Sequence, residues 1–419
     1  MSPNSTITIP NLHRLVLDNG ITLIVVENQA ADIISGRFFF KGAGTIIERR
    51  EQAGLTHLVS AVITKGTEKL SALEIAEKIE SIGAGLGADA STDYFALSLK
   101  TVSADFPEML KLLGEIMRSP TFPESEVELE RKLTLQGIKS QKEQPFNVAF
   151  NQLRQQMYPQ HPYGVSVLGT ETSVAALSRE DLQQYHQTYF RPDNLVISLS
   201  GRITQERGVK FISDVFGDWQ NPDSPLPASK LESPIVNPSE ATIVQDTQQS
   251  IVMLGYLGTA VNSSDYAVLK LISTYLGNGL SSRLFVELRE KRGLAYDVSA
   301  FFPTRLDNAP FVTYMGTAPT NTEIAIEGLS GEVKRLTETI LSEEEIQGAK
   351  NKFLGQYALG KQTNGEIAQT YGWYETLGLG LEFDRHFQAA VPPITAETIQ
   401  EVANRYLSKP YLSLVKPEA

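Results

Sequence analysis

The chain has 419 residues, of which 41% are hydrophobic and 21% charged, an ordinary globular composition that excludes a wholly disordered protein. Its net charge of −12 argues against a general nucleic-acid binder, which needs a basic surface to meet phosphates. Because the chain has no cysteine, disulfides, thiolate metal sites and a cysteine nucleophile are impossible, and a histidine-dependent site must use the five histidines.

The first part of the chain begins with a strand pattern and continues with helices. Residues 13–27 predict a β-hairpin, because Asp18-Asn19-Gly20 supplies a tight turn in which Asn-Gly tolerates positive φ. Ser71 and Glu74 fit a capping box that starts a helix. The expected elements after the hairpin are, in order, a strand over 33–40, helices over 52–66 and 71–82, a loop over 83–91, a strand over 94–102, and helices over 105–117 and 124–142.

A proline-rich stretch near the middle divides the chain. Residues 217–239 hold five prolines and few large apolar residues, which is typical of a linker. We therefore expect an N-terminal half over 1–217, a linker over 218–239 and a C-terminal half over 240–419.

The two halves repeat the same pattern of elements. A strand over 311–320 and helices over 322–340 and 340–357 follow the order seen in the first half. An acidic helix start, then Val or Ile, then a basic residue four positions on, recurs at an offset of 219 in Val127/Arg131 and Ile346/Lys350. We predict an α+β fold with two similar halves related by a pseudo-two-fold, each a mostly antiparallel sheet covered by helices on one face.

Several segments in order resemble one known family. They read LDNGITLIVVE, GAGTIIE, AGLTHLV followed by KGT, ERKLTLQGI, HPYGVSVLGT, YHQTYFRPDN and SSRLFVELREKRGLAYDVSA. Together they resemble the pitrilysin and mitochondrial-processing-peptidase family of zinc peptidases, and the resemblance spans essentially the whole chain. Active members of that family use an inverted motif, H-x-x-E-H, on a helix. Its histidines hold zinc, its Glu activates a water, and a Glu on a later helix is the third ligand.

The zinc motif is degenerate in this sequence. The matching pentapeptide reads HLVSA, so His57 remains while Ser60 replaces the general base and Ala61 the second histidine. In the later helix Glu130 keeps the acidic head of the pattern, but Gly137 occupies the ligand position. Catalytic zinc usually needs three protein ligands, and neither alanine nor glycine has a donor side chain. We expect no metal on this chain, and we interpret the remaining histidine as a packed helix residue.

The second half keeps a pair of residues that would serve a peptidase. In the resembled family, an Arg and a Tyr at the spacing of Arg289 and Tyr296 bind the substrate peptide and stabilise the reacting carbonyl. Taken alone, an Arg in a charged helix is more often a salt-bridge former, but the order and spacing of the motif favour the functional role. Gly277-Asn278-Gly279 precedes this motif, and we predict a helix-to-helix turn there instead of a long glycine-rich capture loop.

In the small bacterial heterodimers of this family, one chain carries zinc and the other supplies the Arg/Tyr pair. The sequence resembles the second kind, a non-catalytic, substrate-binding subunit of a heterodimeric zinc metallopeptidase that cleaves peptides or unfolded segments. Zinc is then expected on the homologous partner subunit. The alternatives are a non-proteolytic scaffold that retains the peptidase fold, and an autonomous peptidase, which would hold stoichiometric zinc. No signal peptide or membrane span is visible, so a soluble, cytoplasmic protein is expected.

Overall fold

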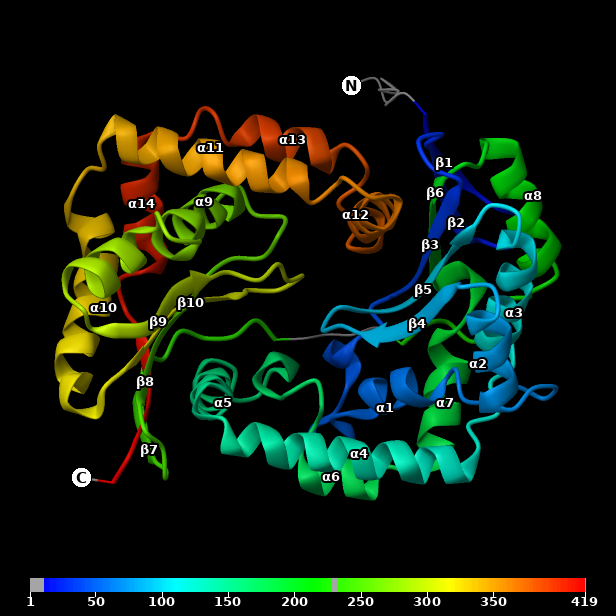
Figure 1. Cartoon of the computed structure of the whole chain (residues 1–419), viewed down its shortest axis with the longest axis horizontal. Helices are drawn as coiled ribbons and strands as arrows, with labels where there is room; N and C mark the ends of the chain where they lie inside the picture. The colour runs from blue at the N-terminus through cyan, green and yellow to red at the C-terminus, as the bar shows by residue number, and fades with distance from the viewer. Residues whose placement is uncertain (1–10, 228–231, 419) are drawn as a thin grey trace. The chain divides into compact units, whose positions relative to one another are not determined.

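The computed structural model describes residues 11–227 and 232–418, which belong to two compact units, each with its own sheet (Figure 1). The first unit comprises Met1–Ile138, Ser166–Ser229 and Gly360–Phe383. The second comprises Lys139–Val165, Lys230–Leu359 and Asp384–Ala419. Each unit therefore takes one short segment from the opposite half of the sequence.

The sheet of the first unit has the strand order β1-β2-β6-β3-β5-β4 and is antiparallel except for the pair β2 and β6. Its strands are β1 (Leu12–Val16), β2 (Thr22–Glu27), β3 (Ile33–Lys41), β4 (Gly85–Ala90), β5 (Tyr94–Val102) and β6 (Leu195–Gly201). The predicted hairpin is confirmed, with Val16 paired to Thr22 and Gly20 at φ 96 in the turn.

The prediction of a loop over 83–91 is wrong, because most of that segment is the edge strand β4. It pairs antiparallel with β5, from Gly85 opposite Lys100 to Ala90 opposite Phe95. Glycine weakens a strand taken alone, but the free edge of β5 supplies backbone partners, and this tertiary pairing overrides the local preference.

The sheet of the second unit repeats the topology of the first. Its order is β7-β11-β8-β10-β9, with β11 and β7 parallel and the other pairs antiparallel. In chain order this matches β2-β6-β3-β5-β4 strand for strand, and only β1 has no counterpart. The strands are β7 (Glu240–Val244), β8 (Ser250–Leu257), β9 (Ala295–Phe301), β10 (Pro310–Thr317) and β11 (Tyr411–Lys416).

The helices also follow the predicted order. Those of the first unit are α1 (Leu55–Val62), α2 (Ala72–Glu80), α3 (Phe106–Arg118), α4 (Glu124–Glu143), α6 (Glu171–Ala176), α7 (Arg179–Tyr189), α8 (Gln205–Phe216) and α12 (Asn364–Thr376). Those of the second are α5 (Pro145–Met157), α9 (Tyr266–Gly277), the π-helix η5 (Phe285–Lys291), α10 (Thr322–Glu338), α11 (Glu343–Leu359), α13 (Phe383–Ala390) and α14 (Ala396–Tyr406). Short 3₁₀ turns are η1 (Thr45–Ile47), η2 (Arg50–Gln52), η3 (Pro162–Gly164), η4 (Pro192–Asn194) and η6 (Pro319–Asn321). The capping box of Ser71 and Glu74 is present at the start of α2.

The sheet of the first unit is buried on both faces. Side chains of a strand alternate between faces, so Phe38 and Phe40 enter the main core with α3 and α8, while Phe39 lies on the other face. There Phe39 packs with residues of α12, including Tyr371 and Trp373. The helix α12 thus adds a layer to the helices that were expected on one face.

The second sheet has an equivalent extra helix, α5, which contacts β8 and β11. The two helices are counterparts, because their first residues, Pro145 and Asn364, are separated by the same offset of 219. Each contact needs a glycine at the point of closest approach. A Cβ at Gly255 of β8 would lie 2.7 Å from the Met157 sulfur, and one at Gly372 of α12 would lie 2.4 Å from a Phe39 ring carbon.

The repeat first seen at Val127/Arg131 and Ile346/Lys350 has a structural role. The residues Val127 and Ile346 are buried at equivalent positions of α4 and α11. The basic residue four positions on donates to backbone carbonyls in both cases. Arg131 reaches the carbonyls of residues 174 and 177, and Lys350 donates to that of Pro392 at 2.8 Å. The shared pattern therefore fixes the same long helix in each unit.

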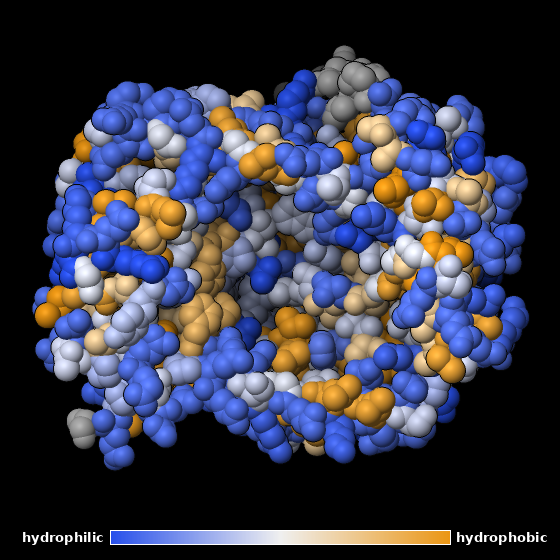
Figure 2. All heavy atoms as spheres, viewed as in Figure 1, coloured by the Kyte–Doolittle hydropathy of each residue, from blue (hydrophilic) through white to orange (hydrophobic). Residues whose placement is uncertain are grey.

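The face drawn in Figure 2 is covered mainly by hydrophilic residues, with hydrophobic ones in small patches. Within the described ranges 11–227 and 232–418, no helix combines the length and the apolar character that a bilayer crossing requires.

Candidate functional site

The helix α1 carries the degenerate motif and is positioned by a buried carboxylate. It begins after Gly54, whose φ of 94 suits glycine. Glu48 accepts hydrogen bonds from the backbone N–H of Gly54 at 2.9 Å, and from the N–H and hydroxyl of Thr56, both at 2.7 Å. Burial raises the pKa of Glu48 to about 7, although the bonds from Thr56 and Gly54 oppose the shift. The motifs in the sequence did not identify Glu48. The feature that could have found it is an acidic residue shortly before the start of a helix.

One face of α1 is buried and the other presents the motif positions. Leu58, Val59 and Val62 are buried, whereas His57, Ser60 and Ala61 are only half-buried. Positions three and four apart lie on the same side of a helix, so the structure brings the three motif positions onto one face.

Two of the polar side chains near His57, those of Ser60 and Glu130, already have partners. The Ser60 hydroxyl donates to the backbone carbonyl of His57 at 2.7 Å, which is a bond within the helix and leaves no base. Burial lowers the pKa of His57, while the charges of Glu130 and Asp89 raise it, so these groups lie near the ring. Lys65 pairs with Glu130 at 3.1 Å. A fixed cation of the chain therefore neutralises the carboxylate that the motif pattern retains.

The position of the third ligand is empty of donor atoms. Gly137 lies in α4, where a Cβ would meet only the Leu168 side chain, at 3.7 Å. Among residues 11–227 and 232–418, no three His, Asp or Glu side chains gather closely enough to hold a metal ion. The donor set around His57 does not fit zinc, which usually takes three protein ligands in a catalytic site.

In the second unit, Arg289 and Tyr296 lie on adjoining elements. Arg289 is on η5, a π-helix, which is a rare conformation that often marks a functional site. Its guanidinium lies 5.0 Å from the centroid of the Phe285 ring, and no carboxylate in the described chain pairs with it. Tyr296 is the second residue of β9 and 61% exposed, because Ala295 takes the inward position. Both side chains are therefore available to a ligand.

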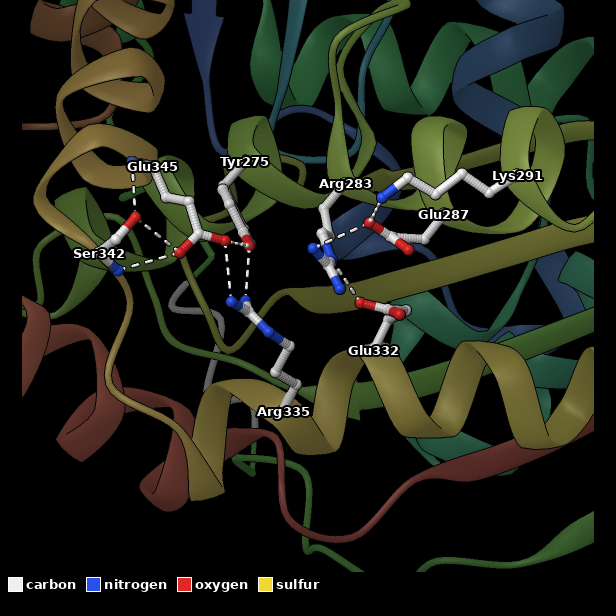
Figure 3. A network of polar contacts seen from close by, with 8 residues as sticks. All are labelled: Tyr275, Arg283, Glu287, Lys291, Glu332, Arg335, Ser342 and Glu345. Carbon is white, nitrogen blue, oxygen red and sulfur yellow. Dashed lines mark hydrogen bonds and ion pairs between the residues drawn. The ribbon is translucent and has the colours of Figure 1, made fainter.

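Three charged side chains near Arg289 form ion pairs, whereas Arg289 forms none in the described chain (Figure 3). Arg283 binds Glu332 at 2.7 Å and Glu287 at 3.0 Å, and Lys291 binds Glu287 at 2.7 Å. The pair of Arg283 and Glu332 links the start of the π-helix to α10, and the pair of Glu287 and Lys291 lies within the π-helix. The turn predicted at Gly277-Asn278-Gly279 is also confirmed, since α9 ends there and leads toward η5.

Two family models match consecutive parts of the chain. Residues 23–171 match the model described as insulinase (peptidase family M16), and residues 176–353 match the one described as the peptidase M16 inactive domain. Among curated proteins, the uncharacterized zinc protease YmxG of Bacillus subtilis is 26% identical over 97% of this chain and 98% of its own length. An uncharacterized zinc protease of Streptomyces coelicolor is 26% identical over 98% of this chain and 90% of its own.

Solved structures show the same fold. A protease from Helicobacter pylori has a TM-score of 0.92 at 21% identity, covering 98% of this chain and all of that one. A peptidase M16 inactive-domain protein from Pseudomonas fluorescens has a TM-score of 0.91 at 25% identity, covering 98% and 99%. The fold and the degenerate motif thus define a zinc-peptidase-like protein with two repeated sheets. The chain belongs to peptidase family M16.

Proposed function

We propose that this chain is the non-catalytic, substrate-binding subunit of a heterodimeric zinc peptidase. A homologous subunit supplies the zinc, and this chain supplies Arg289 and Tyr296. The substrates are peptides or unfolded segments, which bind a sheet edge through backbone hydrogen bonds with loose sequence demands.

Two observations support this proposal. The first unit has lost the metal ligands of the motif, and the second unit has an arginine and a tyrosine that are available to a ligand. Ala61 and Gly137 have no donor atom, and the Ser60 hydroxyl is bonded to its own helix. The Arg289 guanidinium, by contrast, is left without a carboxylate partner in the described chain, whereas Glu287 and Lys291 of the same helix pair with each other. An exposed arginine usually forms a salt bridge with a nearby carboxylate. Because Arg289 forms none in the described chain, its guanidinium keeps its donors for a ligand.

The arginine and tyrosine suit the chemistry of a partner's metal site. A guanidinium offers fixed donors to substrate carbonyl oxygens, and a phenol donates to an oxyanion as it develops. Neither residue activates a water, so this chain has no peptidase activity of its own in this scheme.

The test is a peptide-cleavage assay of this chain mixed with its zinc-bearing partner. Arg289→Ala should lower kcat/KM of the mixture by about 100-fold, the usual loss for one transition-state donor. Tyr296→Phe should lower kcat while the complex still forms. Arg202→Ala is the matched control, because that exposed arginine lies on the other unit, near Asp32. Unchanged cleavage by the Arg289→Ala mixture would remove the proposed role.

The same mixture distinguishes the proposed role from the alternative of a non-proteolytic scaffold. A stable complex of wild-type chains that turns over no peptide would favour a non-proteolytic scaffold. Stoichiometric zinc and cleavage by the isolated chain would favour an autonomous peptidase instead.

A further inference from the structure

A cavity of about 560 Å³ lies wholly within the second unit. It is lined by α9, the segment from Ser281 to Glu287, and α11. Small-molecule sites in proteins typically have volumes of roughly 300–1,000 Å³, so this cavity is large enough for a ligand. By the repeat, α9 and α11 are the counterparts of α1 and α4, the helices that carry the degenerate zinc motif.

Among the charged groups that line the cavity, Arg283, Glu287 and Glu345 are paired, whereas Glu344 has no ion pair in the described chain (Figure 3). Arg283 is held between Glu287 and Glu332. On the other side, Glu345 accepts from Tyr275 at 2.8 Å and from Arg335 at 2.9 Å. These groups form the wall and have little capacity left for an incoming charge.

Lys352 is the exception among the lining cations. Its ammonium lies 3.4 Å from the Ser281 hydroxyl, and the described chain offers it no carboxylate within 4.0 Å. Burial lowers the pKa of Lys352, as expected for a half-buried ammonium without a counter-charge. A half-buried ammonium that still has free hydrogen-bond donors can bind an anionic ligand through charge-assisted hydrogen bonds.

The cavity also has an apolar wall, and one of its lining residues is a glycine. Val286 and Ala349 line it. Gly348, in the interior of α11, is exposed, and a Cβ there would meet nothing within 4 Å.

We propose that this cavity binds a small carboxylate that carries a short apolar group. The Lys352 ammonium and the Ser281 hydroxyl hold the carboxylate, and Val286 and Ala349 contact the apolar group. The ligand is either a free organic acid or the C-terminal residue of a peptide, which share this chemistry. The site goes beyond the proposed subunit role and does not depend on it, because all of its residues belong to one unit.

The experiment is calorimetric titration of the full chain with three probes: 4-methylpentanoate, glycyl-leucine and glycyl-leucinamide. Binding of glycyl-leucine alone assigns the site to peptide C-termini, and binding of 4-methylpentanoate alone assigns it to free acids. In either case the amide should bind at least tenfold more weakly, because it lacks the charge. Equal binding of the amide, or no binding of either acid, overturns the proposal.

Two variants locate the binding. Lys352→Met should weaken it by about tenfold, the loss expected for one charge-assisted hydrogen bond. Gly348→Leu should abolish it by filling the cavity. Gly331→Leu is the matched control, because Gly331 is an exposed glycine inside α10 with equally open space but outside the cavity. Circular dichroism establishes that each variant folds. Wild-type binding by a folded Gly348→Leu variant would place the ligand elsewhere and overturn the proposal.

Discussion

Restoring the missing ligands should give this chain a zinc site. The perturbation is the triple change Ser60→Glu, Ala61→His and Gly137→Glu, which rebuilds the inverted motif around His57. Burial lowers the pKa of His57, so its ring is neutral near pH 7 and able to bind a metal. We expect about one equivalent of zinc in the purified variant, and less than about a tenth in the wild type.

The structure allows the effects of two of the three changes on the free energy of unfolding to be compared. At Gly137 a Cβ would make an ordinary contact with Leu168, at 3.7 Å, and replacing a helical glycine gains about 0.5–1 kcal/mol. Ser60→Glu loses the hydroxyl bond to the His57 carbonyl, which costs about 0.5–1.5 kcal/mol. The changes in the free energy of unfolding therefore nearly offset, and zinc at 100 times its Kd should stabilise the variant by about 2.7 kcal/mol.

The assay is metal content after gel filtration, together with thermal unfolding with and without zinc. The matched control replaces Gly137 by Ala while keeping the other two changes, so it lacks only the third ligand. A folded triple variant that binds no more zinc than this control would refute the expectation that a Glu at position 137 completes the ligand set of His57 and position 61. An equivalent of zinc on the wild-type chain would refute the larger argument that it lacks a metal site.

Two further predictions concern stability. Burial lowers the pKa of His186 to about 4, so the folded state keeps the ring neutral, although the Met117 carbonyl, 2.8 Å from Nε2, opposes the shift. The stability that it contributes is present above the ordinary pKa of 6.5 and is lost as pH falls toward 4, by roughly 2 kcal/mol at pH 5. Urea unfolding should show this fall in the wild type and not in His186→Gln; parallel pH profiles would contradict it. Gly372→Ala should destabilise the first unit by at least about 2 kcal/mol, because its Cβ would overlap Phe39. Gly355→Ala, at an open site in α11, should instead stabilise by about 0.5–1 kcal/mol, and calorimetric melting of both tests the contrast.

Local sequence signals predicted the elements well where the chemistry is local. The turn at Gly20 and the capping box at Ser71 depend on neighbouring residues, and both are present. The motif positions on α1 also follow from helical periodicity, since residues three and four apart share a face.

The rest depends on contacts between distant segments. The strand β4 was predicted as a loop because its glycines disfavour a strand locally, and the pairing with β5 that stabilises it is not visible in the local sequence. The layer formed by α12 rests on Gly372 meeting Phe39, more than 300 residues earlier in the chain, and no local pattern encodes such a contact. Glu48 was missed because its role appears only when its carboxylate meets the start of α1.

The exchange of α5 and α12 has a consequence for any attempt to divide this protein. A fragment that ends in the proline-rich stretch would keep the first sheet but lose α12, and Phe39 and Val196 would face water. The complementary fragment would leave β8 and β11 bare without α5. Expressed separately, each piece would be prone to aggregation, whereas synthesis of both in the same cell would let each supply the helix that the other lacks.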